Sequence, residues 1–100
     1  MRTTFTGAAR RDLAGIIRYS RDTWGVEQSA AYLGDINARL AQLAGSPALG
    51  RARDDLAPSL RAFPTQSHVI YYLVVEGGIS IVRILHERQD PTRYLPQIGA

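Results

Sequence analysis

The side chains most able to do chemistry in this sequence are two histidines, His68 and His86, and 12 basic residues, all of them arginine. A guanidinium group is planar and always charged, and it pairs with carboxylates and phosphates through two parallel hydrogen bonds. The chain has no cysteine, so it holds no thiol nucleophile, disulfide or thiolate zinc site. These residue types favour recognition of an anionic group.

The two histidines come close together if the strands around them pair as a hairpin. Glu87 or Asp90 would then be the nearest carboxylate to complete a metal site. Two histidines without the i, i+4 spacing of a helix are a weak metal signal, so we expect no metal and no other cofactor. No serine lies in a nucleophile-elbow context and no glycine-rich loop precedes a helix, so neither pattern predicts an enzyme.

The same hairpin would gather five basic side chains at one end of the predicted sheet: Arg61, His68, Arg83, His86 and Arg88. Two interpretations stay open. The cluster is a solvated sheet end without a ligand, or it holds a phosphate or an acidic protein surface through paired hydrogen bonds.

Length, charge and composition limit the classes of function. One hundred residues suffice for a single domain, which we predict to span residues 1–100. The net charge of +3 is spread along the chain, so we expect no direct sequence-specific nucleic-acid binding. The most apolar run, 69–75, is far shorter than the roughly 20 residues that span a bilayer, and residues 1–5 lack a signal-peptide core. We therefore expect a cytoplasmic protein without membrane contact.

Apolar side chains recur at helical spacing along two neighbouring segments, 8–23 and 26–44. Thr6 is placed to cap the first helix, and Gly25 ends it because glycine tolerates the positive φ angle often found there. Proline at position 47 stops the second helix. The apolar stripes comprise Leu13, Ile16, Ile17, Ser20 and Trp24, then Tyr32, Leu33, Ile36, Leu40 and Leu43. They predict an antiparallel α-hairpin with Trp24 and Tyr32 in its core.

Extended segments follow the helices. Strands are predicted at 60–63, 68–76 and 79–86, in addition to a short one at 2–5, while residues 45–59 are expected to form an irregular connection. The predicted fold is α+β, with an N-terminal antiparallel α-hairpin packed on a mostly antiparallel sheet of about four strands.

Gly77-Gly78 suits a two-residue loop between the last two long strands. With that loop, Val75 faces Ser80 and Tyr72 faces Arg83. Past the hairpin, Asp90-Pro91 is typical of a helix start and predicts a short turn of helix through Leu95.

Both faces of the predicted hairpin are apolar. Ile70, Tyr72, Val74, Ile79, Ile81 and Leu85 share one face, and Val69, Tyr71, Leu73, Val75, Val82 and Ile84 share the other. The α-hairpin covers one face of the sheet. The second face needs another cover, because exposing its apolar side chains to water would cost several kcal/mol of folding free energy. A protein partner, the C-terminal segment 90–100 and self-association are the alternatives.

Five segments together resemble the ParE branch of the RelE/ParE toxin superfamily. They are Trp24–Tyr32 (WGVEQSAAY), Pro47–Arg51 (PALGR), Leu60–Phe63 (LRAF), His68–Tyr72 (HVIYY) and Ile81–Asp90 (IVRILHERQD). The segments occur in the family's order and cover roughly residues 3–95. The resemblance implies the toxin of a type II toxin–antitoxin system, with the α-hairpin-on-sheet fold already predicted from the residues.

In that family a ParD-like antitoxin wraps the toxin in a hetero-oligomeric complex, which would cover an apolar sheet face. The residues expected to bind it are Ile70, Tyr72, Val74, Ile81 and Leu85. ParE toxins act on DNA gyrase and block replication by binding, without catalysis. The residues expected to touch that target are Arg83, His86, Arg88 and Tyr94.

RelE-type relatives instead cut messenger RNA on the ribosome. Arg61, Arg88 and Tyr94 stand near positions where that pattern has basic residues or tyrosine, but His68 stands where it usually has arginine. Under this alternative, the catalytic residues would be Arg61, His68, Arg88 and Tyr94. The Trp24–Tyr32 and Ile81–Asp90 segments favour the ParE side, and hence a gyrase-directed toxin.

Overall fold

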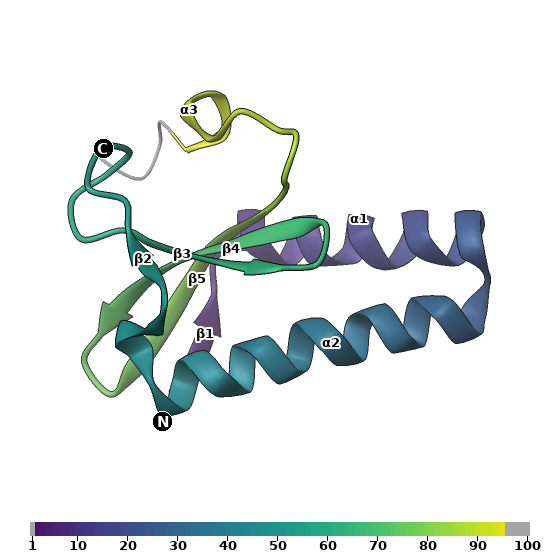
Figure 1. Cartoon of the computed structure of the whole chain (residues 1–100), viewed down its shortest axis with the longest axis horizontal. Helices are drawn as coiled ribbons and strands as arrows, with labels where there is room; N and C mark the ends of the chain where they lie inside the picture. Colours follow the sequence, from purple (N-terminus) through teal and green to yellow (C-terminus); the bar gives the residue numbers. More distant parts are fainter. Residues whose placement is uncertain (1, 96–100) are drawn as a thin grey trace.

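The computed structural model describes residues 2–95, in which an antiparallel helix pair packs against one five-stranded sheet (Figure 1). The strand order is β1-β5-β4-β3-β2, with β1 parallel to β5 and the other neighbours antiparallel. In chain order the elements are β1 (Arg2–Phe5), α1 (Gly7–Trp24), α2 (Val26–Gly45), the 3-10 turn η1 (Pro47–Leu49), β2 (Arg51–Ala52), β3 (Arg61–Thr65), β4 (His68–Val75), β5 (Gly78–His86) and α3 (Pro91–Tyr94). The predicted α+β architecture is confirmed, with one more strand, β2, inside the segment expected to be irregular.

Local signals set the helix ends as predicted. The Thr6 side chain accepts a hydrogen bond from the Ala9 amide (3.1 Å), and its hydroxyl donates to the Val82 carbonyl (2.7 Å), tying the start of α1 to β5. Gly25 has a φ of 93° between α1 and α2. Asp90 caps α3 by accepting from the Thr92 amide (3.0 Å).

The loop of the β4–β5 hairpin is Glu76-Gly77 rather than Gly77-Gly78, because Val75 pairs with Gly78. Gly77 supplies the positive φ of the turn, at 81°. Gly78 instead lies in β5, where any Cβ atom would come within 1.8 Å of the Arg2 carbonyl oxygen. Strand β1, which is distant in the sequence, packs closely against Gly78 and keeps this residue in β5. The predicted loop was therefore wrong by one position.

A β-bulge then shifts the hairpin register a second time. Tyr72 pairs with Ile81 and Tyr71 with Arg83, so Val82 is an extra residue on β5. The predicted Tyr72–Arg83 and Val75–Ser80 pairings are wrong because of the displaced loop, since Tyr72 and Val75 both lie between the loop and the bulge. Past the bulge the face assignment exchanges: Ile84 joins the helix side and Leu85 the opposite side, the reverse of the prediction.

The helix-facing side of the sheet forms the larger core. Ile36 and Leu43 of α2 are fully buried against Ile70, Tyr72 and Ile81 of the hairpin. Leu40 and Tyr32 are buried as predicted. Trp24 is not a core residue, since 48% of it is exposed at the end of α1.

The opposite side of the sheet is covered by the chain itself. Leu60 of the β2–β3 connection and Leu95, just after α3, are buried against Tyr71, Val82 and Leu85. Self-covering by the C-terminal segment was one of the expected alternatives, and within the described residues Leu95 provides it; residues 96–100 lie outside the described part. An apolar second face is therefore not by itself a reason to require a partner.

Neither long helix within residues 2–95 combines the length and apolar character needed to cross a membrane.

Candidate functional site

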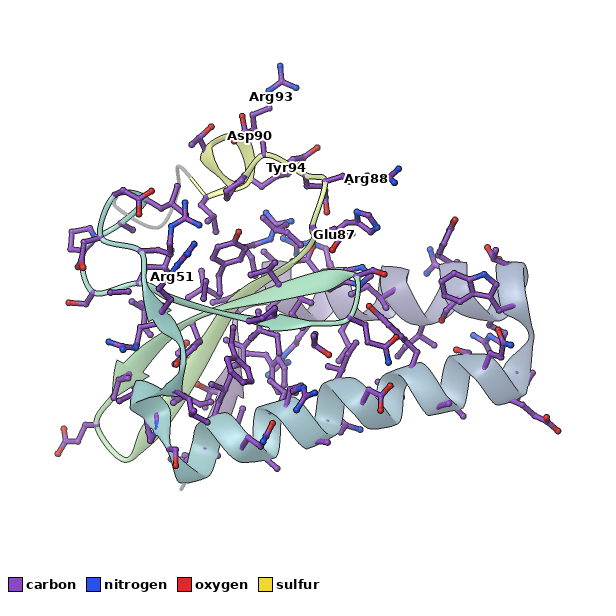
Figure 2. All side chains as sticks on the ribbon, viewed as in Figure 1. Arg51, Glu87, Arg88, Asp90, Arg93 and Tyr94 are labelled. Atoms are coloured by element: carbon purple, nitrogen blue, oxygen red, sulfur yellow. The ribbon has the colours of Figure 1, made fainter. Side chains whose placement is uncertain are left out.

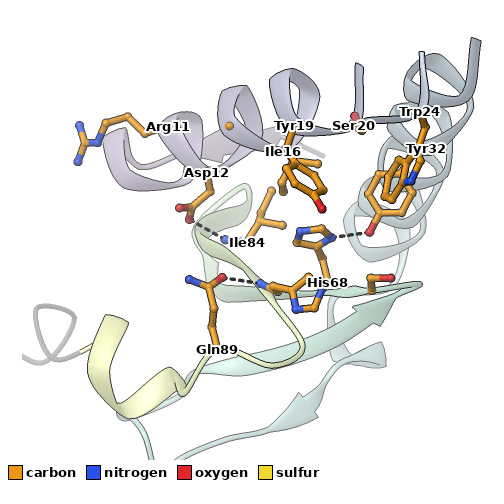
Figure 3. Close-up of a pocket in the computed structure, with 13 residues that line it drawn as sticks. Arg11, Asp12, Ile16, Tyr19, Ser20, Trp24, Tyr32, His68, Ile84 and Gln89 are labelled. Atoms are coloured by element: carbon orange, nitrogen blue, oxygen red, sulfur yellow. Dashed lines mark hydrogen bonds between the residues drawn. The ribbon is translucent and has the colours of Figure 1, made fainter. Parts of the chain in front are cut away.

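His68 and His86 meet at the open end of the β4–β5 hairpin, as the sequence predicted. They are direct partners across the two strands, with ring centroids 5.3 Å apart and planes nearly perpendicular. The Tyr32 hydroxyl of α2 is hydrogen-bonded to His68 Nδ1 (Figure 3). Burial, and then the neighbouring His86, lower the pKa of His68, which favours the neutral form of its ring.

The tautomer of His86 follows from its backbone surroundings. Its Nδ1 lies 3.1 Å from the amide nitrogen of Arg88, which can only donate. The neutral His86 ring therefore carries its proton on Nε2. Its own backbone amide donates to Gln89 Oε1 (2.7 Å), which closes the turn that follows β5.

Aromatic rings continue outward from the two histidines along the helix pair. Tyr32 contacts His68 at 5.5 Å between centroids, Trp24 contacts Tyr32 at 6.4 Å, and Tyr19 contacts Trp24 at 5.9 Å, all with inclined planes. These five rings border a cleft of about 480 Å³ between α1 and the open end of the hairpin (Figure 3). We call it the aromatic cleft.

The guanidinium group of Arg83 is not free to bind a target, because it is hydrogen-bonded within the fold. Nε and Nη2 donate to the two carboxylate oxygens of Asp12 (2.7 and 2.8 Å), and Nη1 donates to the Tyr94 carbonyl (2.9 Å). The ion pair is largely buried, with side-chain exposures of 18% for Arg83 and 15% for Asp12. The hydrogen bonds to Asp12 raise the pKa of Arg83. Arg83 thus has a structural role in the fold, and its expected contact with a target stays a prediction.

Asp12 is the important residue that sequence reasoning missed. Besides pairing with Arg83, its carboxylate accepts a hydrogen bond from the Ile84 amide (3.0 Å). The only signal in the sequence was one carboxylate beside two arginines on α1, which normally indicates a solvated helix face.

Arg61 does not join the histidine end of the sheet, contrary to the predicted five-residue cluster. It pairs with Tyr72, four residues along β4 from His68, which is about 13 Å of strand. Its guanidinium donates to the carbonyl oxygens of Gly50 (2.9 Å) and Ala48 (3.0 Å). The structure therefore separates Arg61 from His68 along the sheet.

Arg88 and Tyr94 remain on the surface, in the segment after β5. Figure 2 shows both around α3, on the side of the molecule away from α2. Tyr94 is 39% exposed, and its ring lies under the Arg83 guanidinium at 5.8 Å. Of the four expected target contacts, Arg88 and Tyr94 are exposed, His86 is half-buried and Arg83 is engaged.

The residues expected to bind the antitoxin are mostly core residues. Ile70, Tyr72 and Ile81 are fully buried beneath the helices, and Leu85 is buried on the opposite side. A partner cannot reach them in this conformation. Of these five, Val74 is available, with 53% exposed at the hairpin tip.

Within residues 2–95, no three histidine, aspartate or glutamate side chains converge in a way that could hold a metal ion.

An α-hairpin packed on a five-stranded sheet has a counterpart among solved structures. A chain of a solved structure described as the chromosomal ParDE TA system from P. aeruginosa superposes with a TM-score of 0.73. At 23% identity, over 86% of this chain and 95% of that one, the likeness shows the shared fold.

The sequence supplies the family itself. Residues 4–91 match the family described as ParE toxin of type II toxin-antitoxin system, parDE, and the chain belongs to this family. It is 38% identical over 89 residues to Toxin ParE1 of Mycobacterium tuberculosis, covering 88% of this chain and 91% of that one. Toxin ParE of Escherichia coli is 36% identical over 86 residues, with 85% and 84% covered. Toxin ParE1 of Caulobacter vibrioides is 33% identical over 87 residues, with 87% and 90% covered.

Proposed function

We propose that this ParE toxin acts by binding DNA gyrase, trapping the enzyme on cleaved DNA and so blocking replication, with no catalytic chemistry of its own. Membership of the ParE family supports this, since binding to gyrase, and not cleavage of messenger RNA, is the mode of action that the resemblance to ParE toxins implies. The exposed Arg88 and Tyr94, together with the half-buried His86, form the proposed contact surface for the target.

The separation of Arg61 from His68 is the observation that carries this proposal. A ribonuclease must place a general base and several cations around one phosphate. Arg61 lies about 13 Å of strand away from His68 and is hydrogen-bonded to two backbone carbonyls. The neutral, half-buried His68 is engaged with Tyr32. This arrangement favours a toxin that works by protein–protein binding.

Induced expression of the full chain distinguishes the two modes of action. Gyrase poisoning gives filamentous cells and DNA cleaved in covalent complex with gyrase, while bulk messenger RNA stays intact. Purified toxin should then inhibit supercoiling by purified gyrase. Rapid loss of translated messages without trapped gyrase would contradict the proposal and support ribosome-dependent cleavage.

We further propose that a ParD-like antitoxin neutralises the toxin in the cytoplasm, as a hetero-oligomeric complex. The tip of the β4–β5 hairpin is a suitable docking surface for the antitoxin, since Val74 and Val75 are exposed there. β3 pairs with β4 only as far as Tyr72, so within the described sheet Leu73–Val75 has a neighbour on the β5 side alone. An extended antitoxin segment could add a strand to that edge and cover the two valines.

Co-expression with the antitoxin tests this second part. Val74→Glu should weaken the toxin–antitoxin complex, whereas Val26→Glu, at an exposed position remote from the hairpin tip, is a matched control that should leave it unchanged. Neutralisation that is insensitive to Val74→Glu would place the antitoxin elsewhere.

A further inference from the structure

The aromatic cleft between α1 and the β4–β5 hairpin has the size and lining of a small-molecule site. Its volume of about 480 Å³ falls in the range of pockets that enclose ligands of drug size. Figure 3 shows that its two ends differ: Arg11 and Gln89 lie towards one end, and Trp24 and Tyr32 towards the other. The cleft is thus amphipathic along its length.

The polar end offers hydrogen-bond donors and positive charge. Arg11 borders the cleft at this end with its side chain directed outward (Figure 3), where its charge is exposed at the mouth of the cleft. His86 carries its proton on Nε2 because Nδ1 accepts the Arg88 amide. Gln89 uses its Oε1 for the His86 amide, which leaves the NH₂ group as the part that a ligand would meet.

The carboxylate at this end, Asp12, does not cancel that charge for a ligand. One of its oxygens accepts from Arg83 Nη2, and the other accepts from Arg83 Nε and the Ile84 amide. Its negative charge is matched by Arg83, and three of its roughly four lone-pair sites already accept hydrogen bonds. A ligand at this end must therefore bring acceptor oxygens, and a carboxylate forms the strongest hydrogen bonds with such donors.

The other end of the cleft is aromatic. Tyr19 and Trp24 meet edge to face there, yet they are 64% and 48% exposed, although large aromatic rings usually bury most of their surface. Ile16 adds an aliphatic wall. A planar ring inserted here would remove apolar surface from water and pack against ring edges and faces.

We propose that the aromatic cleft binds a small aromatic carboxylate, with its ring against Tyr19 and Trp24 and its carboxylate towards Arg11 and His86. The cleft shares His86 with the proposed target surface, but the evidence for it, the volume and the lining of the cleft, does not rest on the proposed function. It goes beyond the proposed function, because no step of gyrase binding requires it.

Three probes with the same phenyl ring and a chain of three carbons but a different polar group test the proposal: 3-phenylpropanoate, its neutral amide and 3-phenylpropylamine. Trp24 is the single tryptophan of the chain, so its fluorescence reports occupancy of the cleft in the full-length protein. We expect saturable binding of the anion with a dissociation constant of about 1 mM, as suits so small a ligand. The amide should bind about tenfold more weakly and the amine more weakly still.

Two variants connect binding to the cleft. Arg11→Gln should reduce the affinity for the anion to that for the amide, whereas Arg10→Gln, on the same helix but outside the cleft lining, should have no effect. Gly15→Leu should abolish binding of all three probes by filling the cleft. It should leave the fold intact, because a Cβ atom at Gly15 meets nothing within 4 Å.

Equal affinities for anion, amide and amine would overturn the proposal, as would binding that survives Gly15→Leu. If none of the probes binds while a purified antitoxin tail shifts the Trp24 signal, the cleft is a protein-docking surface and the proposal is wrong.

Discussion

Asp12 of α1 and Arg83 of β5 lie 71 positions apart in the sequence, and two parallel hydrogen bonds of 2.7 and 2.8 Å join them. The same guanidinium donates to the Tyr94 carbonyl, so one side chain ties together the first helix, strand β5 and the C-terminal turn. The C-terminal turn then positions Leu95 over the second apolar face of the sheet. A pair hidden in the sequence therefore organises the end of the chain that carries the proposed target contacts.

Asp12→Asn should lower the free energy of unfolding by about 1.5–3 kcal/mol, because it replaces charge-assisted hydrogen bonds in a largely buried pair. Amide hydrogen exchange should rise across residues 91–95, which Arg83 holds in place. Urea denaturation measures the first effect. Asp55→Asn is the control, since Asp55 pairs with Arg53 on an exposed surface and its loss should not be resolvable. Equal effects of both substitutions would contradict the role of Asp12.

Ile36→Ala should destabilise the protein by about 2–5 kcal/mol, because Ile36 is fully buried between α2 and the sheet and its truncation leaves a cavity. Thermal or urea unfolding measures the loss. Leu49→Ala, at a half-exposed position in η1, should cost much less. A loss below about 0.5 kcal/mol at Ile36 would mean that the observed helix face does not support the fold.

Stability should fall as the pH drops below the usual histidine pKa of 6.5, because burial lowers the pKa of His68 in the folded state. Above that pH both states bind no proton at this ring and His68 contributes no slope; below it the unfolded state gains the proton first. The loss should level off below the folded-state pKa. Unfolding curves from pH 7.5 to about 5 should show this slope, and His68→Gln should remove most of it. An identical slope in the variant would assign the effect to other groups.

Replacement of Arg88 and Tyr94 by alanine should weaken gyrase binding about 30-fold, since arginine and tyrosine are frequent energetic centres of interfaces. Both side chains are exposed, so the fold should be retained, as circular dichroism would show. Growth after induction and inhibition of supercoiling measure the effect. Arg39→Ala, on the outer face of α2, is the control that should remain toxic. Unchanged toxicity of the double variant would remove these residues from the target surface.

The helices, the strands and the family were within reach of the sequence, because each depends on local signals. The Thr6 cap, the glycine at position 25 and the Asp90-Pro91 start act within one helical turn, and alternation of apolar residues marks strands wherever they pair. The prediction of two histidines side by side also succeeded. A displacement of one or two residues along the hairpin still leaves both at its open end.

Contacts between segments that are distant in the sequence determined the hairpin register and the buried ion pair. Docking of β1 against Gly78 moved the hairpin loop, and the bulge at Val82 exchanged the faces of Ile84 and Leu85. Strand register follows from the total packing free energy of both sheet faces, which no short stretch of sequence contains. For the same reason the pairing of Asp12 with Arg83, and the cover that Leu95 provides, could be seen only once the tertiary structure brought those segments together.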